Sequence, residues 1–434
     1  MPSTTYETIH ETVHRETLPN GLEVVLVPKR GYSKTYAVFT TRYGSIDHHF
    51  QVEGEPAREV PDGIAHFLEH KLFEEEWGDI FHKFSELGAS ANAFTSHNRT
   101  AYLFSATERV EESLSTLLDF VQRPHLTPES VEKEKGIIEQ EIRMYDDMPF
   151  WRGYKHLLEG LFHVHPVRID IAGTVESIAK IDRDTLMSCY ASFYHPGNMV
   201  LAVVGDFDPE RIMTLIRENQ AAKSFSPPRG IKRFVEVEPP TVASARHEVK
   251  LAVSRPLALF GFKEKRPFEG IAQLRQELLM GLALDLIFGR ASELYTELLD
   301  SGLIDDSFSF DYEVGPGFGF SYVGSETPDP AALESRIKAG LTAVLERGLD
   351  PEDFERGRRK QLGDFLHMLN SPEAIANYVT EIRFKEGDFF ALPDLLTELT
   401  VEEANQALRE HYDLDQIAVS LVLPNGEAAS EEAA

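Results

Sequence analysis

The amino-acid sequence predicts an α+β fold made of two homologous halves, each a mostly antiparallel sheet packed with helices. Strand-like apolar runs alternate with longer segments of helical periodicity, and hairpin-like neighbours are present instead of a regular βαβ alternation. The order of these segments in the first half recurs in the second half. The chain has 434 residues, whereas single cores stop growing near roughly 250–300 residues, so at least two lobes are expected.

The first half begins with a β-hairpin, because the turn at Asn20-Gly21 precedes a strand pattern over 22–27. The remaining elements of this half, in chain order, are a helical stretch (62–88), a strand (101–107), two helices (109–123 and 128–147) and a closing strand (199–207).

The second half repeats this order. Its elements are a strand (256–264), a long apolar helix (269–300), a strand (317–326), two further helices and a last strand (417–424). Two short matches support a duplication, because 126–132 resembles 349–355 and 84–87 resembles 295–298, in the same order and at similar spacing.

The predicted domain boundaries follow from this plan. The parts are an N-terminal half (1–223), a linker rich in proline and charge (224–242), a C-terminal half (243–424) and a flexible tail (425–434). Because no glycine-rich phosphate loop follows a strand, a nucleotide-binding fold is disfavoured.

Composition narrows the classes of function. The formal net charge of -29 and the pI of about 4.9 argue against a nucleic-acid partner or an anionic membrane surface. Cys189 is the single cysteine, so an intrachain disulfide is excluded. Neither a signal-peptide core nor an apolar run of about 18 residues occurs, so we expect no membrane span and a soluble, cytoplasmic protein.

A candidate metal motif lies in the predicted helical stretch, where His66-Phe67-Leu68-Glu69-His70 occurs. Histidines four residues apart lie on one helix face, so both imidazoles can reach one Zn²⁺. Glu69 borders the same face and can take the proton of a bound water. Such a pattern also arises by chance, but apolar flanks predict a buried helix in which polar groups need partners.

A third ligand is expected from the helix over 128–147, which Thr127 can cap. Glu134, Ile138, Glu141 and Tyr145 form one stripe at helical spacing. Carboxylates on a core-facing stripe are costly unless they are paired or bound to metal. If one of the two glutamates binds the metal, the other can orient a histidine; the alternative is that both lie at the surface.

These motifs together resemble the pitrilysin/insulinase family of zinc metallopeptidases, which includes the mitochondrial processing peptidase. HFLEH is the inverted H-x-x-E-H signature of the inverzincins, and EKGIIEQE (134–141) resembles the family's second glutamate motif. The resemblance implies a two-halved clamshell with His66, His70 and Glu141 as zinc ligands and Glu69 as catalytic base. Glu134 then takes the place of the residue that orients a ligand.

The implied activity is that of a zinc-dependent endopeptidase that hydrolyses peptides or small unfolded proteins, with zinc-bound water activated by Glu69. The segment GASANAFTSHNRTAYLF (88–104) resembles the family's edge strand, to which substrate adds as a further strand. The matching substrate-binding positions are Asn92, Ala93 and Phe94. From the residues alone, an ordinary loop and strand is the alternative.

One departure from the family concerns the second half. Active members present an arginine and a tyrosine there, but this chain has Leu299 at the first position and Asp305 or Asp306 at the second. The resemblance therefore implies the zinc-bearing subunit of a bacterial pair, with a homologous partner that supplies Arg and Tyr, or otherwise a homodimer. Arg290 is a candidate substitute, and a binding or assembly subunit that retains the zinc motif is the alternative function.

Overall fold

The computed structural model describes residues 1–266 and 268–425, so nine of the ten residues of the predicted tail (426–434) lie outside the described part. The chain forms two compact units. Unit 1 comprises Met1–Ile142, Asp170–Phe234 and Phe365–Ala391, and unit 2 comprises Arg143–Ile169, Val235–Asp364 and the chain from Leu392. Each sequence half therefore contributes one segment to the compact unit formed mainly by the other half.

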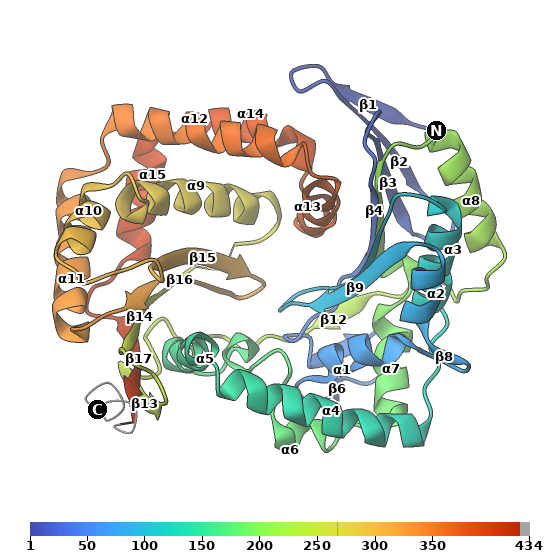
Figure 1. Cartoon of the computed structure of the whole chain (residues 1–434), viewed down its shortest axis with the longest axis horizontal. Helices are drawn as coiled ribbons and strands as arrows, with labels where there is room; N and C mark the ends of the chain where they lie inside the picture. The colour runs from blue at the N-terminus through green and yellow to red at the C-terminus, as the bar shows by residue number, and fades with distance from the viewer. Residues whose placement is uncertain (267, 426–434) are drawn as a thin grey trace. The chain divides into compact units, whose positions relative to one another are not determined.

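Unit 1 is built on a seven-stranded sheet (Figure 1). Its strands are β1 (Ser3–Tyr6), β2 (Glu11–Thr17), β3 (Glu23–Pro28), β4 (Thr35–Thr41), β9 (Ala89–Thr95), β10 (Thr100–Ala106) and β11 (Met199–Gly205). The order is β1-β2-β3-β11-β4-β10-β9, and only the β3/β11 pair is parallel. The predicted hairpin is the β2/β3 pair, whose turn contains Gly21 at a φ of 90°, a conformation that favours glycine.

Unit 2 contains a five-stranded sheet. Its strands are β13 (Arg246–Leu251), β14 (Leu257–Lys263), β15 (Ser309–Gly315), β16 (Phe318–Glu326) and β17 (Ile417–Pro424). The order is β13-β17-β14-β16-β15, with a parallel β13/β17 pair and antiparallel neighbours elsewhere. This order and these directions repeat β3-β11-β4-β10-β9 of unit 1, and the predicted α+β class with two mostly antiparallel sheets is confirmed.

The helices of the first half come next in the chain. They are α1 (Ile64–Leu72), α2 (Ile80–Glu86), α3 (Val110–Val121), α4 (Pro128–Asp146), α5 (Pro149–Leu161), α6 (Val175–Ile178), α7 (Arg183–Phe193) and α8 (Pro209–Ala221). The predicted helical stretch over 62–88 is two helices, separated by the ribbon of β7 (Glu74–Glu75) and β8 (Gly78–Asp79). Gly78 has a φ of 133°, which a helix cannot contain. A small sheet joins β5 (His49–Val52), β6 (Arg58–Glu59) and β12 (Ile231–Arg233).

The helices of the second half are α9 (Gly270–Phe288), α10 (Glu293–Asp300), α11 (Pro330–Arg347), α12 (Pro351–Met368), α13 (Pro372–Phe384), α14 (Leu392–Thr397) and α15 (Val401–His411). The predicted single helix over 269–300 is wrong, because it is interrupted after Phe288. Gly289 takes an extended conformation, and Ser292 accepts a hydrogen bond from the Tyr295 N–H and so begins α10.

Both faces of the central strands are covered. Every residue of β4 and β11 is buried, and Phe39 and Leu201 point into the main core of unit 1. Their neighbours point to the opposite face, where α13 packs on β4 and β11. In unit 2, α5 packs in the same way on β14 and β17, and Gly261 of β14 lets Leu157 of α5 approach closely. Thus the second half supplies a helix to unit 1, and the first half supplies one to unit 2.

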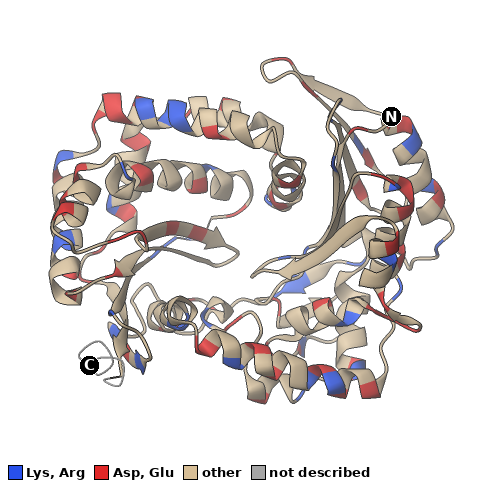
Figure 2. Ribbon diagram, viewed as in Figure 1, with Lys and Arg blue, Asp and Glu red and all other residues tan. Residues whose placement is uncertain are grey.

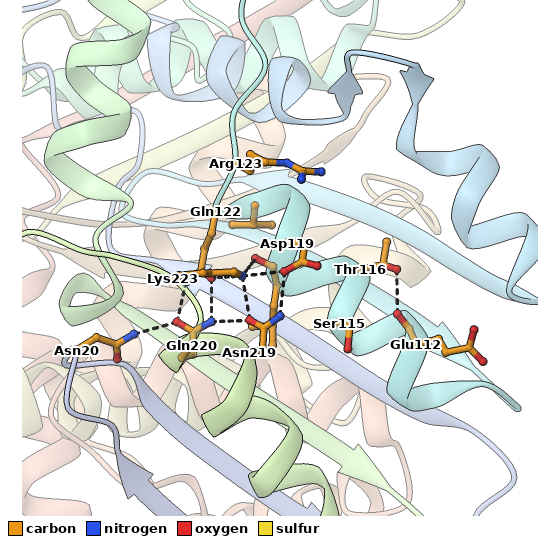
Figure 3. Close-up of polar contacts among 12 residues, drawn as sticks. Asn20, Glu112, Ser115, Thr116, Asp119, Gln122, Arg123, Asn219, Gln220 and Lys223 are labelled. Carbon is orange, nitrogen blue, oxygen red and sulfur yellow. Dashed lines mark hydrogen bonds and ion pairs between the residues drawn. The ribbon is translucent and has the colours of Figure 1, made fainter.

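Polar contacts fix α8 against α3 (Figure 3). Lys223 donates to the Leu118 carbonyl at 3.0 Å and to Gln122 Oε1 at 2.7 Å, so it ties the residues after α8 to the end of α3. Gln220 accepts from Asn20 Nδ2 at 2.9 Å, which adds the β2/β3 turn to this network.

Charged side chains lie mainly on helices such as α4 and α12, whereas β4 and β11 carry none (Figure 2). Within residues 1–266 and 268–425, none of the helices combines the length and apolar character that a membrane span needs.

Candidate metal centre

Helix α1 places the histidine motif over the edge of the unit 1 sheet. Gly63 precedes the helix at a φ of 85°, and Phe67 and Leu68 are fully buried in the core. The helix packs on β9 and β10, where Ala91 and Ala93 are small enough to allow close packing. The side chains on the other side of α1, His66 and His70 among them, face a site between this helix, β9 and α4.

His66, His70 and Glu141 converge at this site. One ligand atom from each lies within 4.8 Å of the other two. Glu141 Oε1 is 3.8 Å from His66 Nε2, and Glu141 Oε2 is 3.5 Å from His70 Nε2. These separations are too long for good hydrogen bonds, and they leave two nitrogens and a carboxylate around one common point. The three predicted ligands are therefore brought together by α1 and α4.

Glu134 lies beside the three candidate ligands. Its Oε1 is 3.1 Å from His70 Nδ1, so this nitrogen donates to the carboxylate and Nε2 is left to face Glu141. Lys71, which is 1% exposed, lies 3.8 Å from Glu134 Oε2 and also contacts Glu74 and the Ser130 carbonyl. Glu134 therefore occupies the predicted position next to a histidine, and Lys71 partly balances its charge.

Glu69 is buried next to the same group of side chains. It is 8% exposed, and the Thr95 hydroxyl donates to its Oε2 at 2.6 Å. Burial raises the pKa of Glu69, although the Thr95 hydrogen bond and the His70 charge oppose this rise. A carboxylate with a raised pKa is better suited to accept a proton near neutral pH.

The donor set fits a zinc ion. Burial and the nearby His70 lower the pKa of His66 to about 3, so its imidazole is neutral, which is the form that binds metals. His66 Nε2, and not Nδ1, faces Glu141 at 3.8 Å, so Nε2 is the nitrogen positioned to bind a metal. Two imidazoles and one carboxylate are a known ligand set for catalytic zinc, which leaves a fourth position for water or substrate.

The predicted substrate-binding residues lie on β9, which pairs with β10 and forms an edge of the unit 1 sheet. The Ser96 N–H donates to the Arg99 carbonyl, and hydrogen-bonded pairs in an antiparallel ladder recur at every second residue. The backbone groups of Ala93 and Thr95 therefore point away from β10. In agreement, the Ala93 N–H donates to Asn92 Oδ1 at 2.9 Å instead.

Phe94 and Asn92 point to the opposite face from Ala93 and Thr95, because side chains alternate along a strand. The Arg99 guanidinium lies 5.4 Å from the centre of the Phe94 ring. The three residues predicted from the resemblance are thus on an edge strand, with Asn92 exposed.

The positions at which the resemblance implies an arginine and a tyrosine lie in unit 2. Leu299 is 44% exposed on α10, and Arg290 is exposed in the turn before that helix. Asp305 pairs with Arg255 at 3.1 Å and accepts from the Ser307 hydroxyl at 2.6 Å, so its carboxylate is already engaged. Neither Leu299 nor Asp305 can donate a hydrogen bond to a substrate carbonyl at neutral pH.

Sequence reasoning missed Thr95 and Lys71. Thr95 directly follows the predicted substrate-binding residues 92–94. Side chains alternate along a strand, so Thr95 shares a face with Ala93, and this is the one signal that could have placed Thr95 toward α1. Lys71 follows His70 in a strongly apolar run, and a charged residue in such a run signals a buried partner.

Family models match most of the chain. The model described as "Insulinase (Peptidase family M16)" matches residues 57–175, and the one described as "Peptidase M16 inactive domain" matches residues 180–361. The first range contains all the candidate metal ligands, and the second contains the segment in which the expected arginine and tyrosine are replaced.

Individual proteins resemble the chain along its length. The "Uncharacterized zinc protease YmfH" of Bacillus subtilis is 48% identical over 96% of this chain and 98% of its own length. A second Bacillus subtilis protein, the "Uncharacterized zinc protease YmxG", is 24% identical over 86% of this chain and 91% of its own length. The crystal structure of a putative M16-like peptidase from Alicyclobacillus acidocaldarius superposes with a TM-score of 0.93 at 44% identity, covering 98% of this chain and 99% of that one.

Proposed function

Because the chain belongs to the insulinase family (peptidase family M16), we propose that it is a zinc-dependent endopeptidase that hydrolyses peptides or small unfolded proteins. The observation that carries the proposal is the convergence of His66, His70 and Glu141 around one point, with buried Glu69 beside them. Two curated relatives are named zinc proteases, which agrees with this assignment.

In this proposal His66, His70 and Glu141 would hold the ion. Bound zinc supplies a Lewis acid that polarises the scissile carbonyl and acidifies a water. Glu134 accepts from His70 Nδ1 and so keeps Nε2 of that ring directed at the site. Glu69 accepts the proton of the attacking water at a carboxylate oxygen and passes it to the leaving amine.

The edge strand β9 aligns the substrate. A peptide in extended conformation can pair with the outward backbone groups of Ala93 and Thr95, and it would replace the contact between the Ala93 N–H and Asn92 Oδ1. Backbone pairing tolerates many side chains, which suits a peptidase acting on varied unfolded segments. Strand addition also holds the scissile bond in place, and such positioning is a large part of catalysis.

A peptide-cleavage assay with metal removal tests the proposal. A quenched fluorescent peptide should be cleaved by the zinc-loaded protein, and cleavage should stop with a chelator and return with added Zn²⁺. Glu69→Gln should keep one zinc per chain and lose roughly 10²–10⁴-fold in rate, because a general base contributes about that much. Glu132→Gln is the matched control, because Glu132 is an exposed glutamate of α4 whose side chain is 68% accessible.

Two outcomes would count against this function. Near wild-type cleavage by Glu69→Gln would show that another group is the base. One zinc per chain without cleavage, alone or with a related subunit, would favour the alternative, a binding or assembly subunit that retains the metal motif.

We further propose that full activity requires a homologous partner chain. The resemblance implies that Leu299, and Asp305 or Asp306, stand where active members carry arginine and tyrosine, and the Asp305 carboxylate is paired with Arg255. A homodimer does not repair this loss, because each copy lacks the same two side chains.

A further inference from the structure

We propose that Thr95 is a positioning residue that holds the Glu69 carboxylate in the orientation needed for proton transfer. The inference deepens the proposed peptidase function and rests on it for the role of Glu69. It depends on the hydrogen bond from the Thr95 hydroxyl to Glu69 Oε2, which is 2.6 Å long.

The strand register directs the Thr95 hydroxyl to Glu69. Thr95 pairs with Thr100 of β10, and the two hydroxyl oxygens are 3.4 Å apart. The Thr100 hydroxyl already donates to the Tyr43 carbonyl at 2.8 Å, so its proton is used there. The Thr95 proton is therefore committed to Glu69, and the short distance is typical of a hydrogen bond to a charged oxygen.

This donor leaves one oxygen of Glu69 for catalysis. Among the described residues, Thr95 provides the one hydrogen bond to the Glu69 side chain. With Oε2 fixed, rotation of the carboxylate is restricted and Oε1 remains to accept a proton from water. Without a donor, a carboxylate that is 8% exposed would have to turn toward whatever solvent it can reach.

The position of Thr95 also links the base to substrate alignment. Its side chain points to Glu69, whereas its backbone groups point to the open edge of β9, next to Ala93. A peptide that pairs with β9 would restrain the same residue that orients the base. We therefore expect loss of the hydroxyl to lower kcat while KM, which reflects backbone pairing, changes little.

The test compares Thr95→Val, Thr95→Ser and the control Thr116→Val. Valine keeps the shape of threonine but cannot donate, so kcat should fall roughly 10- to 100-fold, the usual effect of losing a hydrogen bond to a charged group. Serine retains the hydroxyl and should restore most of the rate. Thr116 is buried in α3, and its hydroxyl donates to the Glu112 carbonyl at 2.8 Å, so its replacement should leave kcat unchanged.

Two further measurements do not depend on cleavage. Zinc affinity of Thr95→Val should change by less than the roughly tenfold that loss of a ligand's partner costs. In the metal-free protein, Thr95→Val should lower the thermal midpoint by roughly 2–8 °C, because a buried carboxylate loses its donor. In a Glu69→Ala background the same change should shift the midpoint by less than half as much.

The results separate this inference from the proposed function. If Glu69→Gln is inactive but Thr95→Val cleaves at the wild-type rate, the positioning role is wrong and the peptidase assignment stands. Equal midpoint shifts in the two backgrounds would overturn the contact itself, whatever the cleavage assay shows. A fall in zinc affinity that matches the fall in kcat would assign Thr95 to metal binding and also overturn the inference.

Discussion

At the residue scale, the two glutamates of α4 have different surroundings. Glu141 faces the Nε2 atoms of both histidines, at 3.8 Å from His66 and 3.5 Å from His70. Glu134 contacts the other nitrogen of His70 at 3.1 Å. Loss of a metal ligand and loss of a group that orients a ligand are expected to lower metal affinity by different amounts.

We predict that Glu141→Gln weakens zinc binding more than Glu134→Gln does. An amide is a poorer ligand than a carboxylate, whereas loss of the contact to His70 should cost about 10- to 100-fold. Competition with a chromophoric chelator measures both variants, with Glu132→Gln as the exposed control on the same helix. The reverse order of affinities would exchange the roles of the two glutamates.

The sequence could predict the histidines and Glu69 because four-residue spacing places His66 and His70 on one face of a single helix, and Glu69, three residues after His66, borders that face. It could not separate Glu134 from Glu141, because seven residues bring both to the same stripe of α4 and only the resemblance chose between them. Thr95 and Lys71 could not be predicted from local pattern. Their partners come from other elements, and pairing between elements depends on tertiary packing.

At the element scale, the hairpin of β9 and β10 is anchored by Arg99. Its Nη2 lies 2.7 Å from Glu381 Oε2, and its Nη1 donates to the Asn377 carbonyl at 3.3 Å. Both partners belong to α13, which covers the face of the unit 1 sheet opposite the main core. The anchoring thus acts on the turn that follows the candidate substrate strand.

We predict that Arg99→Met loosens this hairpin. Amide hydrogen exchange over 89–101 should become faster, because the hairpin loses its ion pair to Glu381, which keeps its pair with Lys385, and the guanidinium no longer covers Phe94. KM for a peptide should rise, since a mobile edge strand loses more conformational entropy when it pairs with the substrate. Arg211→Met is the control, because Arg211 makes an exposed pair with Glu111. Unchanged exchange over the hairpin would contradict the anchoring role.

In unit 2, Glu238 holds the segment of residues 163–165 that follows α5. Its carboxylate accepts from the backbone N–H groups of 163–165 and from Lys263 Nζ at 2.7 Å. Burial would raise the pKa of Glu238, but these donors outweigh it and lower the pKa to about 2. A lowered pKa in the folded state contributes stability above the ordinary value of 4.5, and this contribution is lost as pH falls toward 2.

We therefore predict that Glu238→Gln destabilises unit 2 by about 2–3 kcal/mol near neutral pH, as expected for a charged hydrogen-bonding group. The difference in thermal midpoint from wild type should shrink as pH is lowered from 5 to about 3, because part of the wild-type advantage is lost over that range. Glu236→Gln, at an exposed position nearby, is the control. A difference that does not depend on pH would show that the charge of Glu238 does not stabilise the segment.

The strands β11, β14 and β17 could be predicted from the sequence, since each is a largely apolar run whose residues are almost all buried. β4 is equally buried but carries three threonines, and it is not among the predicted strands. The two long helical predictions failed at Gly78 and Gly289. Apolar spacing continued through both positions, so the pattern alone did not show that the backbone leaves the helix there.

At the scale of the whole molecule, the partner requirement gives the clearest biochemical prediction. The isolated zinc-loaded chain should show weak peptide cleavage, and activity should rise strongly when a homologous subunit with Arg and Tyr is added. One oxyanion donor contributes about 3–4 kcal/mol, or roughly 10²–10³-fold in rate. Removing the partner's arginine should abolish the gain.

The contrary result is also specific. Strong activity from the isolated chain that is lost in Arg290→Ala would show that Arg290 substitutes for the missing pair. The partner requirement would then be wrong, while the zinc ligands and Glu69 would keep their assigned roles.

The exchange of α5 and α13 between the two units could not be predicted. Both helices follow a long charged helix, and hydrophobic periodicity identifies an amphipathic helix without naming the sheet that it covers. The repeated strand order shows that they occupy corresponding places in the two sheets. Duplication of the plan could therefore be inferred from the sequence, but not this reciprocal packing.

The exchange has a consequence for how the protein is made. Residues up to Phe234 leave the ribosome well before Phe365–Ala391, the last segment of unit 1. At the usual rate of synthesis the delay is roughly 7–30 s. During that time the face of β4 and β11 opposite the main core has no α13 to cover it, so the nascent chain displays an apolar surface that a chaperone can bind. A message truncated after the first half would yield a chain that keeps this surface permanently, and we expect it to aggregate instead of folding as an independent zinc-binding domain.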